Sequence, residues 1–91
     1  MQINIAGHHV DVTDGIRDSI NSKFKKIGNH YPDINSISIT LTVDRHEQKI
    51  EAHALYRGVA ISVSAVDTDL YVAIANVVRK LDSSLASRKS V

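Results

Sequence analysis

The last third of the chain, residues 59–89, reads VAISVSAVDTDLYVAIANVVRKLDSSLASRK. Residues 59–65 alternate apolar and small side chains, which predicts a strand with one buried face. Residues 67–69, Asp-Thr-Asp, supply capping groups and negative charge that favour a helix start. Apolar residues then recur on a single helical stripe: Leu70, Ile74, Val77, Val78, Leu81 and Leu85. This stretch therefore predicts a strand, a turn and one long helix.

The amino-terminal part of the chain predicts another strand and helix. Residues 1–7 alternate apolar and polar side chains, as expected of a strand with one apolar face. Thr13 resembles a helix cap, and apolar residues follow it at helical spacing: Ile16, Ile20, Phe24 and Ile27. Gly28 is a good terminator and Pro32 prevents continuation, so we expect this helix to span residues 14–27.

Two further strands are predicted in the middle of the chain. Residues 36–43 alternate Ile, Leu and Val with Ser and Thr, and residues 49–56 show a similar alternation. A polar turn over residues 44–47 separates them. Arg57-Gly58 fits a tight hairpin turn into the last strand, because Gly readily adopts a positive φ.

The resulting element order, β-α-β-β-β-α, predicts an α+β fold. A strand-helix-strand opening implies a parallel pair joined by a right-handed crossover, and the later strands form an antiparallel meander. Each helix has one apolar stripe and each strand one apolar face, so both helices are expected on one face of a four-stranded mixed sheet. We expect a two-layer sandwich, similar to double-stranded RNA-binding domains, in a single domain over residues 1–91.

The composition excludes several classes of function. The formal net charge is +1, so nucleic-acid binding would have to come from clustered cations rather than from an overall excess. Cysteine is absent, which excludes disulfides, thiolate metal sites and a thiol nucleophile. Residues 1–5 lack a basic leader and a long apolar run, so we expect no signal peptide or membrane span and a cytoplasmic location.

Catalysis and metal binding find little support. The five histidines and ten acidic residues are scattered, without a serine elbow, a metal-binding helix pair or a glycine-rich phosphate loop. His8 and His9 are the strongest metal signal, but adjacent strand residues usually diverge and no third ligand has a recognisable spacing. We expect no enzyme, no cofactor and no functional metal, and at most adventitious metal capture by this pair.

Basic residues cluster on the two predicted helices. Lys23 and Lys26 are three residues apart and share one side of the first helix. The basic residues outside the apolar stripe of the last helix are Arg79, Lys80, Arg88 and Lys89. If the helices lie side by side, these residues form a positive band, while most acids fall near strand ends, turns and helix starts. From the residues alone, an RNA-binding surface and ordinary solvated helix faces both fit.

The outer face of the predicted sheet is a second candidate surface. It carries Ser, Thr, Gln, Asn and His53, without the aromatics on which RNA-recognition motifs stack bases. A sheet-face reader of single-stranded RNA is therefore excluded, but a protein-interaction module that uses Thr40, Thr42 and His53 is not. Tyr71 could stack on a base, although a tyrosine at the first turn of a helix more often packs across the core edge.

Three segments carry a family resemblance. They are the opening Met-Gln-Ile-Asn-Ile-Ala-Gly, the helix end Lys23-Phe24-Lys25-Lys26-Ile27, and Asp69-Leu70-Tyr71-Val72-Ala73-Ile74 followed by Lys80-Leu81. With them, essentially the whole chain resembles the short-form ribosome hibernation promoting factors of the sigma-54 modulation protein family, which are related to the ribosome-associated inhibitor. The length is similar to that of the short form.

The resemblance implies a cytoplasmic stationary-phase factor that binds the small ribosomal subunit between head and body. It would contact 16S rRNA, cover the mRNA and tRNA path of the decoding channel, and favour inactive ribosome dimers together with ribosome modulation factor. No membrane and no small-molecule substrate is implied. Family contacts fall on basic residues of both helices, matched here by Lys23, Lys26, Arg79, Lys80, Arg88 and Lys89.

One departure from the family concerns the end of the last helix. Family members often carry lysines there, whereas this chain has Ser83, Ser84 and Ser87. Fewer cations at this end lower the expected strength of RNA attachment.

Overall fold

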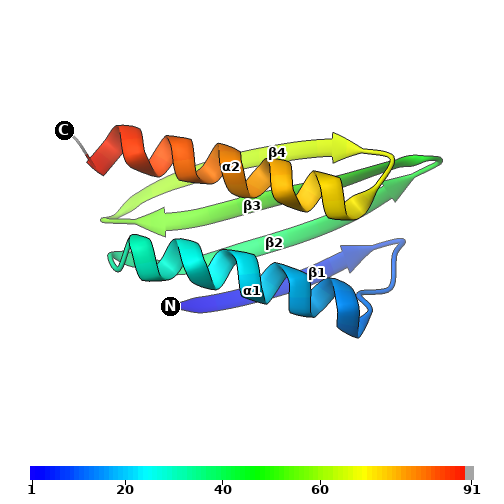
Figure 1. The fold of residues 1–91 in the computed structure, drawn as a ribbon, viewed down its shortest axis with the longest axis horizontal. Helices are drawn as coiled ribbons and strands as arrows, with labels where there is room; N and C mark the ends of the chain where they lie inside the picture. The colour runs from blue at the N-terminus through cyan, green and yellow to red at the C-terminus, as the bar shows by residue number, and fades with distance from the viewer. Residues whose placement is uncertain (90–91) are drawn as a thin grey trace.

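The computed structural model describes residues 1–89 and confirms the predicted element order. Figure 1 shows the six elements in chain order. Their bounds are β1 Gln2–His8, α1 Asp14–His30, β2 Ile34–Asp44, β3 Glu47–Tyr56, β4 Val59–Asp67 and α2 Leu70–Lys89. Strands β2 and β3 are longer than their alternating patterns indicated, so only the two residues Arg45 and His46 separate them.

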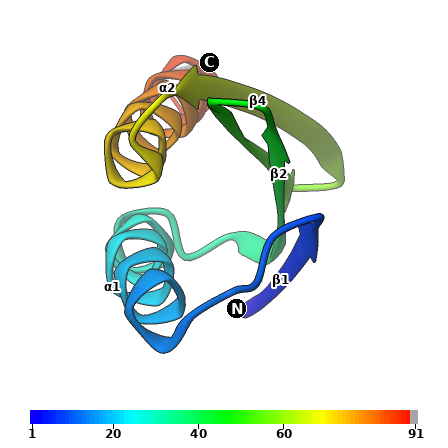
Figure 2. The ribbon, with the colours of Figure 1, turned by 90° about the vertical axis from the view of Figure 1, so that its right-hand side faces the viewer.

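The four strands form one mixed sheet in the order β1-β2-β3-β4. Strand β1 runs parallel to β2, and the β2–β3 and β3–β4 pairs are antiparallel. Both helices cover the same face of this curved sheet and lie side by side (Figure 2). The predicted two-layer architecture with a parallel opening and an antiparallel meander is therefore confirmed.

The core lies between the sheet and the helices. Alternate residues of the central strands are buried, among them Ile37 of β2 and Ile50 of β3, while the residues between them face solvent. Phe24 of α1 and Ile74 of α2 are fully buried above them. Apart from Tyr31 and Tyr56, no side chain with a polar group within the described chain is buried, so the charged groups lie at the surface.

Helix α1 extends beyond the predicted end at Ile27 and reaches His30. The backbone N–H of Tyr31 donates to the Ile27 oxygen at 2.8 Å and closes the last turn. Gly28 therefore lies inside the helix, where a Cβ would fall 2.6 Å from Met1 Cε. The prediction that Gly28 ends the helix was wrong. Gly28 does not form a left-handed cap but stays inside the helix, where its lack of a side chain leaves room for Met1.

The predicted turns and caps are present. Thr13 Oγ1 accepts a hydrogen bond from the Ile16 N–H at 3.3 Å at the start of α1. Asp69 Oδ1 accepts from the Tyr71 N–H at 2.9 Å at the start of α2. Arg57 and Gly58 have φ values of 52° and 78°, the left-handed conformation expected of a tight hairpin turn.

Candidate nucleic-acid interface

Three of the predicted basic residues line one groove between α1 and α2. Lys23 and Lys26 come from α1, and Arg79 comes from α2. We call this depression the inter-helix groove. Its other lining residues are Ile27, His30, Ala75, Val78 and Asp82. The folded chain therefore brings together cations that lie more than fifty residues apart in sequence.

Helical spacing explains why these side chains meet. Lys23 and Lys26 are three residues apart and flank one side of α1, beside the buried Ile27. On α2, Ala75, Val78, Arg79 and Asp82 recur at intervals of three or four residues and so share one side. The two helices run in the same direction, which places these sides next to each other (Figure 1).

Asp82 is a groove residue that sequence reasoning missed. Its backbone oxygen accepts a hydrogen bond from the Tyr31 hydroxyl at 3.4 Å. Burial raises the pKa of Tyr31, and the hydrogen bond and charge of Asp82 raise that pKa further. The Asp82 carboxylate offsets part of the charge of the three groove cations. Its position three residues after Arg79, on the same side of α2, could have predicted that Asp82 lines the groove.

Arg79 and Lys80 point in different directions although they are adjacent. One terminal nitrogen of Arg79 donates to Asn76 Oδ1 at 2.7 Å, within the same helix. Lys80 Nζ instead donates to the backbone oxygen of Ser64 on β4 at 2.7 Å. Lys80 is not among the residues that line the inter-helix groove. Arg79 and Lys80 nevertheless both line a depression between α2 and β4, so Arg79 borders this depression as well as the inter-helix groove.

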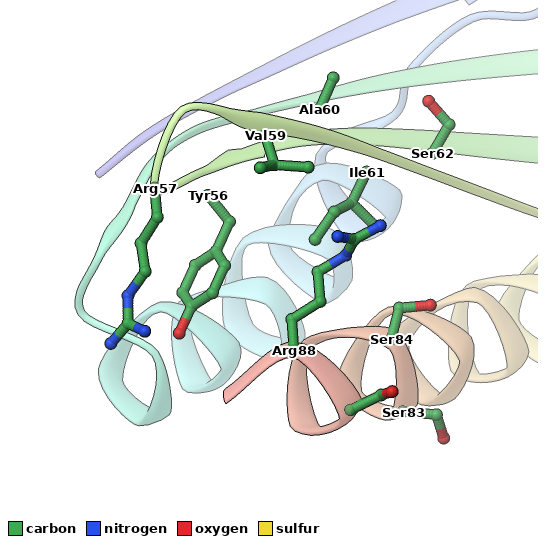
Figure 3. A pocket seen from close by; sticks show the side chains of 10 residues that line it. Tyr56, Arg57, Val59, Ala60, Ile61, Ser62, Ser83, Ser84 and Arg88 are labelled. Carbon is green, nitrogen blue, oxygen red and sulfur yellow. The ribbon is translucent and has the colours of Figure 1, made fainter. Parts of the chain in front are cut away.

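Arg88 lies at the carboxyl end of α2, on the flank that faces β4. It lines a hollow between this end of the helix and the β3–β4 hairpin. In Figure 3 its side chain reaches from α2 toward β4 and lies beside Ile61. Lys89 closes the helix, but its side chain lies outside the described part of the structure.

The open sheet face carries an ordered polar network. Lys49 Nζ lies 3.1 Å from Glu51 Oε1, and His53 Nδ1 lies 2.7 Å from Ser62 Oγ. The hydrogen bond and charge of Lys49, with a smaller contribution from His53, lower the pKa of Glu51. Thr40 pairs with Glu51 in the β2–β3 register. The His53 and Ser62 side chains are exposed to solvent.

Tyr71 lies between the first turns of the two helices. A Cβ on Gly15 would fall 3.3 Å from the Tyr71 hydroxyl oxygen, so the side chain reaches toward α1. Tyr71 is nevertheless 51% exposed. The expected packing across the core edge is therefore only partial.

The described residues form neither a metal cluster nor a membrane-spanning helix. Within residues 1–89, no three His, Cys, Asp or Glu side chains lie together as a possible metal site. Neither described helix is long and apolar enough to cross a membrane.

Comparison with known proteins identifies the family. Residues 3–90 match the family described as Sigma 54 modulation protein / S30EA ribosomal protein. The chain belongs to this family. It is 38% identical to the ribosome hibernation promoting factor of Azotobacter vinelandii, over 98% of this chain and 83% of that protein. It is 32% identical to the factor of that name in Escherichia coli strain K12, over 98% of this chain and 94% of that protein.

Two solved structures have a similar fold. A ribosomal subunit interface protein from Coxiella burnetii has a TM-score of 0.95 at 23% identity, with both chains fully covered. The N-terminal domain of Thermus thermophilus Protein Y has a TM-score of 0.84 at 27% identity, over 92% of this chain and 94% of that one. The predicted resemblance is confirmed, and so is a role without catalysis, since the family is one of ribosome-associated proteins that are not enzymes.

Proposed function

We propose that this chain is a ribosome hibernation factor that binds the small ribosomal subunit at the mRNA and tRNA channel. The names of its relatives and its family membership support a ribosomal partner. The observation that carries the proposal is the meeting of Lys23, Lys26 and Arg79 in the inter-helix groove. A groove lined by cations on a nearly neutral chain is suited to RNA phosphates.

The mechanism is competition by shape and charge. Cations of the inter-helix groove neutralise phosphates of the 16S rRNA, and the rigid two-layer body occupies the path of mRNA and tRNA. Because phosphate contacts are independent of sequence, the shape of the subunit selects the site. Arg88, Lys80 and Lys89 make peripheral contacts. In stationary phase, the bound protein acts in the cytoplasm with ribosome modulation factor to favour inactive ribosome dimers.

A competition experiment tests this function. Purified small subunits carry labelled tRNA on an mRNA, and the protein is added at increasing concentration. We expect wild-type protein to release the tRNA, and Lys26→Gln to require a higher concentration. Lys25→Gln is the matched control, because Lys25 is adjacent but lines a different depression, beside Met1 and Asn29. Simultaneous binding of tRNA and protein to one subunit would exclude a position in the channel.

The polar network on the open sheet face supports a second candidate function. His53 and Ser62 lie within hydrogen-bond distance of each other, beside a charged Lys49–Glu51 pair. Such a face suits a protein partner better than stacked bases. Substitution of Thr40, Thr42 and His53 would then abolish association while changes in the inter-helix groove would not.

A further inference from the structure

The hollow between α2 and the β3–β4 hairpin contains a second cationic site. It is lined by Arg57 of the hairpin turn, by Arg88 and serine residues of α2, and by Tyr56, over a partly apolar floor. In Figure 3 the side chains of Arg57 and Arg88 lie on either side of Tyr56, and their guanidinium groups point away from each other. Sequence reasoning treated Arg57 only as a turn residue.

Arg57 is held in place by two contacts. Its Nε donates to Asp33 Oδ2 at 2.8 Å, and its guanidinium carbon lies 5.1 Å from the centre of the Tyr56 ring. The hydrogen bond to Asp33 raises the pKa of Arg57. Since a guanidinium has five N–H groups and Nε uses one, its terminal nitrogens can still donate to an anion. A fixed guanidinium loses less freedom when it binds an anion than a mobile one does.

Arg88 supplies the second positive group. It forms no ion pair with any residue that the structure describes. Ser84, one turn before Arg88 on α2, adds a hydroxyl to the same wall. Val59 is 42% exposed on the hairpin side and offers an apolar surface. Two guanidiniums, hydroxyls and an apolar patch match the chemistry of a nucleotide within an unpaired strand.

We propose that the hairpin hollow binds successive backbone phosphates of unpaired RNA, with Arg57 and Arg88 as separate cationic ligands. The inference rests on the proposed function, because it takes RNA as the partner. The hollow lies on the β4 flank of α2, whereas the inter-helix groove lies on the α1 flank. Helix α2 is then a ridge contacted by RNA on both sides. Asp33 weakens this site by neutralising part of the Arg57 charge.

The test measures binding of a short labelled oligouridylate to the full chain at several salt concentrations. Arg57→Gln and Arg88→Gln should each bind several-fold more weakly at low salt and lower the salt slope by about 0.7. Asp33→Asn should bind more tightly than wild type, a gain that loss of folding cannot produce. Arg45→Gln is the matched control, because Arg45 occupies the β2–β3 turn and does not line the hollow.

Nuclear magnetic resonance locates the contact. Oligouridylate should shift the amide signals of Val59 and Ser84, and inorganic phosphate alone should reproduce these shifts only weakly. The inference is overturned if Arg57→Gln and Arg88→Gln keep the wild-type salt slope. It is also overturned if phosphate alone gives the same shifts at the same concentration, which would mean a simple anion site. Either result leaves the tRNA competition on small subunits unaffected, so failure of the inference and failure of the proposed function are distinguishable.

Discussion

Lys80 and Ser64 connect the last helix to the edge of the sheet, because Lys80 Nζ donates a hydrogen bond to the Ser64 backbone oxygen at 2.7 Å. Strand β4 is the outermost strand on this side of the sheet, and its outward backbone groups have no neighbouring strand. The lysine therefore satisfies an edge carbonyl as well as joining two elements.

Replacing Lys80 with Met should destabilise the fold. The change removes the cross-link to β4 but keeps a long side chain with good helix propensity. We expect a loss of about 0.5–1 kcal/mol in the free energy of unfolding, measured by urea denaturation. Arg79→Met is the control, since Arg79 bonds only within its own helix, to Asn76. Equal stability of the two variants would show that the Lys80 hydrogen bond contributes nothing.

Alanine at two glycines should have opposite effects on stability. A Cβ on Gly28 would meet Cε and Sδ of Met1, the mobile end of a half-exposed side chain that can move aside. Gly28→Ala should therefore stabilise the helix by about 0.5–1 kcal/mol through its higher propensity. A Cβ on Gly7 would fall 2.5 Å from the backbone oxygen of Val10, which cannot move easily. Gly7→Ala should therefore lower the melting temperature, and a stabilised Gly7→Ala variant would contradict this packing.

Stability should fall at alkaline pH through Tyr31. Its folded-state pKa is raised above the unfolded value of about 10, first by burial and then by Asp82. The neutral phenol is thus favoured in the folded protein, so its contribution is complete below the unfolded pKa and is lost as pH rises through the folded pKa. Thermal unfolding from neutral to alkaline pH should show a steeper decline for wild type than for Tyr31→Phe. Parallel curves would refute this role of Tyr31.

The sequence predicts the architecture well because alternation and helical spacing are local properties. Burial alternates along β3 and along β2 from Ile37 onward, and the stripe of α2 is buried almost as expected. The end of α1 could not be predicted in the same way. Gly28 lies against Met1, the amino-terminal residue, and the local sequence around Gly28 does not reveal this contact.

The candidate site could be predicted only in part, for a related reason. Spacing alone places Lys23 beside Lys26, and their pairing with Arg79 follows once the helices lie side by side. The position of Lys80 outside the inter-helix groove depends on how α2 is rotated over β4, which only the packed structure specifies. Arg57 was missed because a turn residue gives no sign that an α2 residue lies across from it.

The measurement that tests the central claim most directly is the salt dependence of binding to purified small subunits. Sedimentation or filter binding gives Kd at several salt concentrations for wild type, Lys26→Gln and Lys25→Gln. We predict that Lys26→Gln lowers the salt slope by about 0.7–0.9 and weakens binding about two- to fivefold, while Lys25→Gln behaves as wild type. Equal slopes for all three proteins, or no binding at low salt, would contradict RNA attachment through the inter-helix groove.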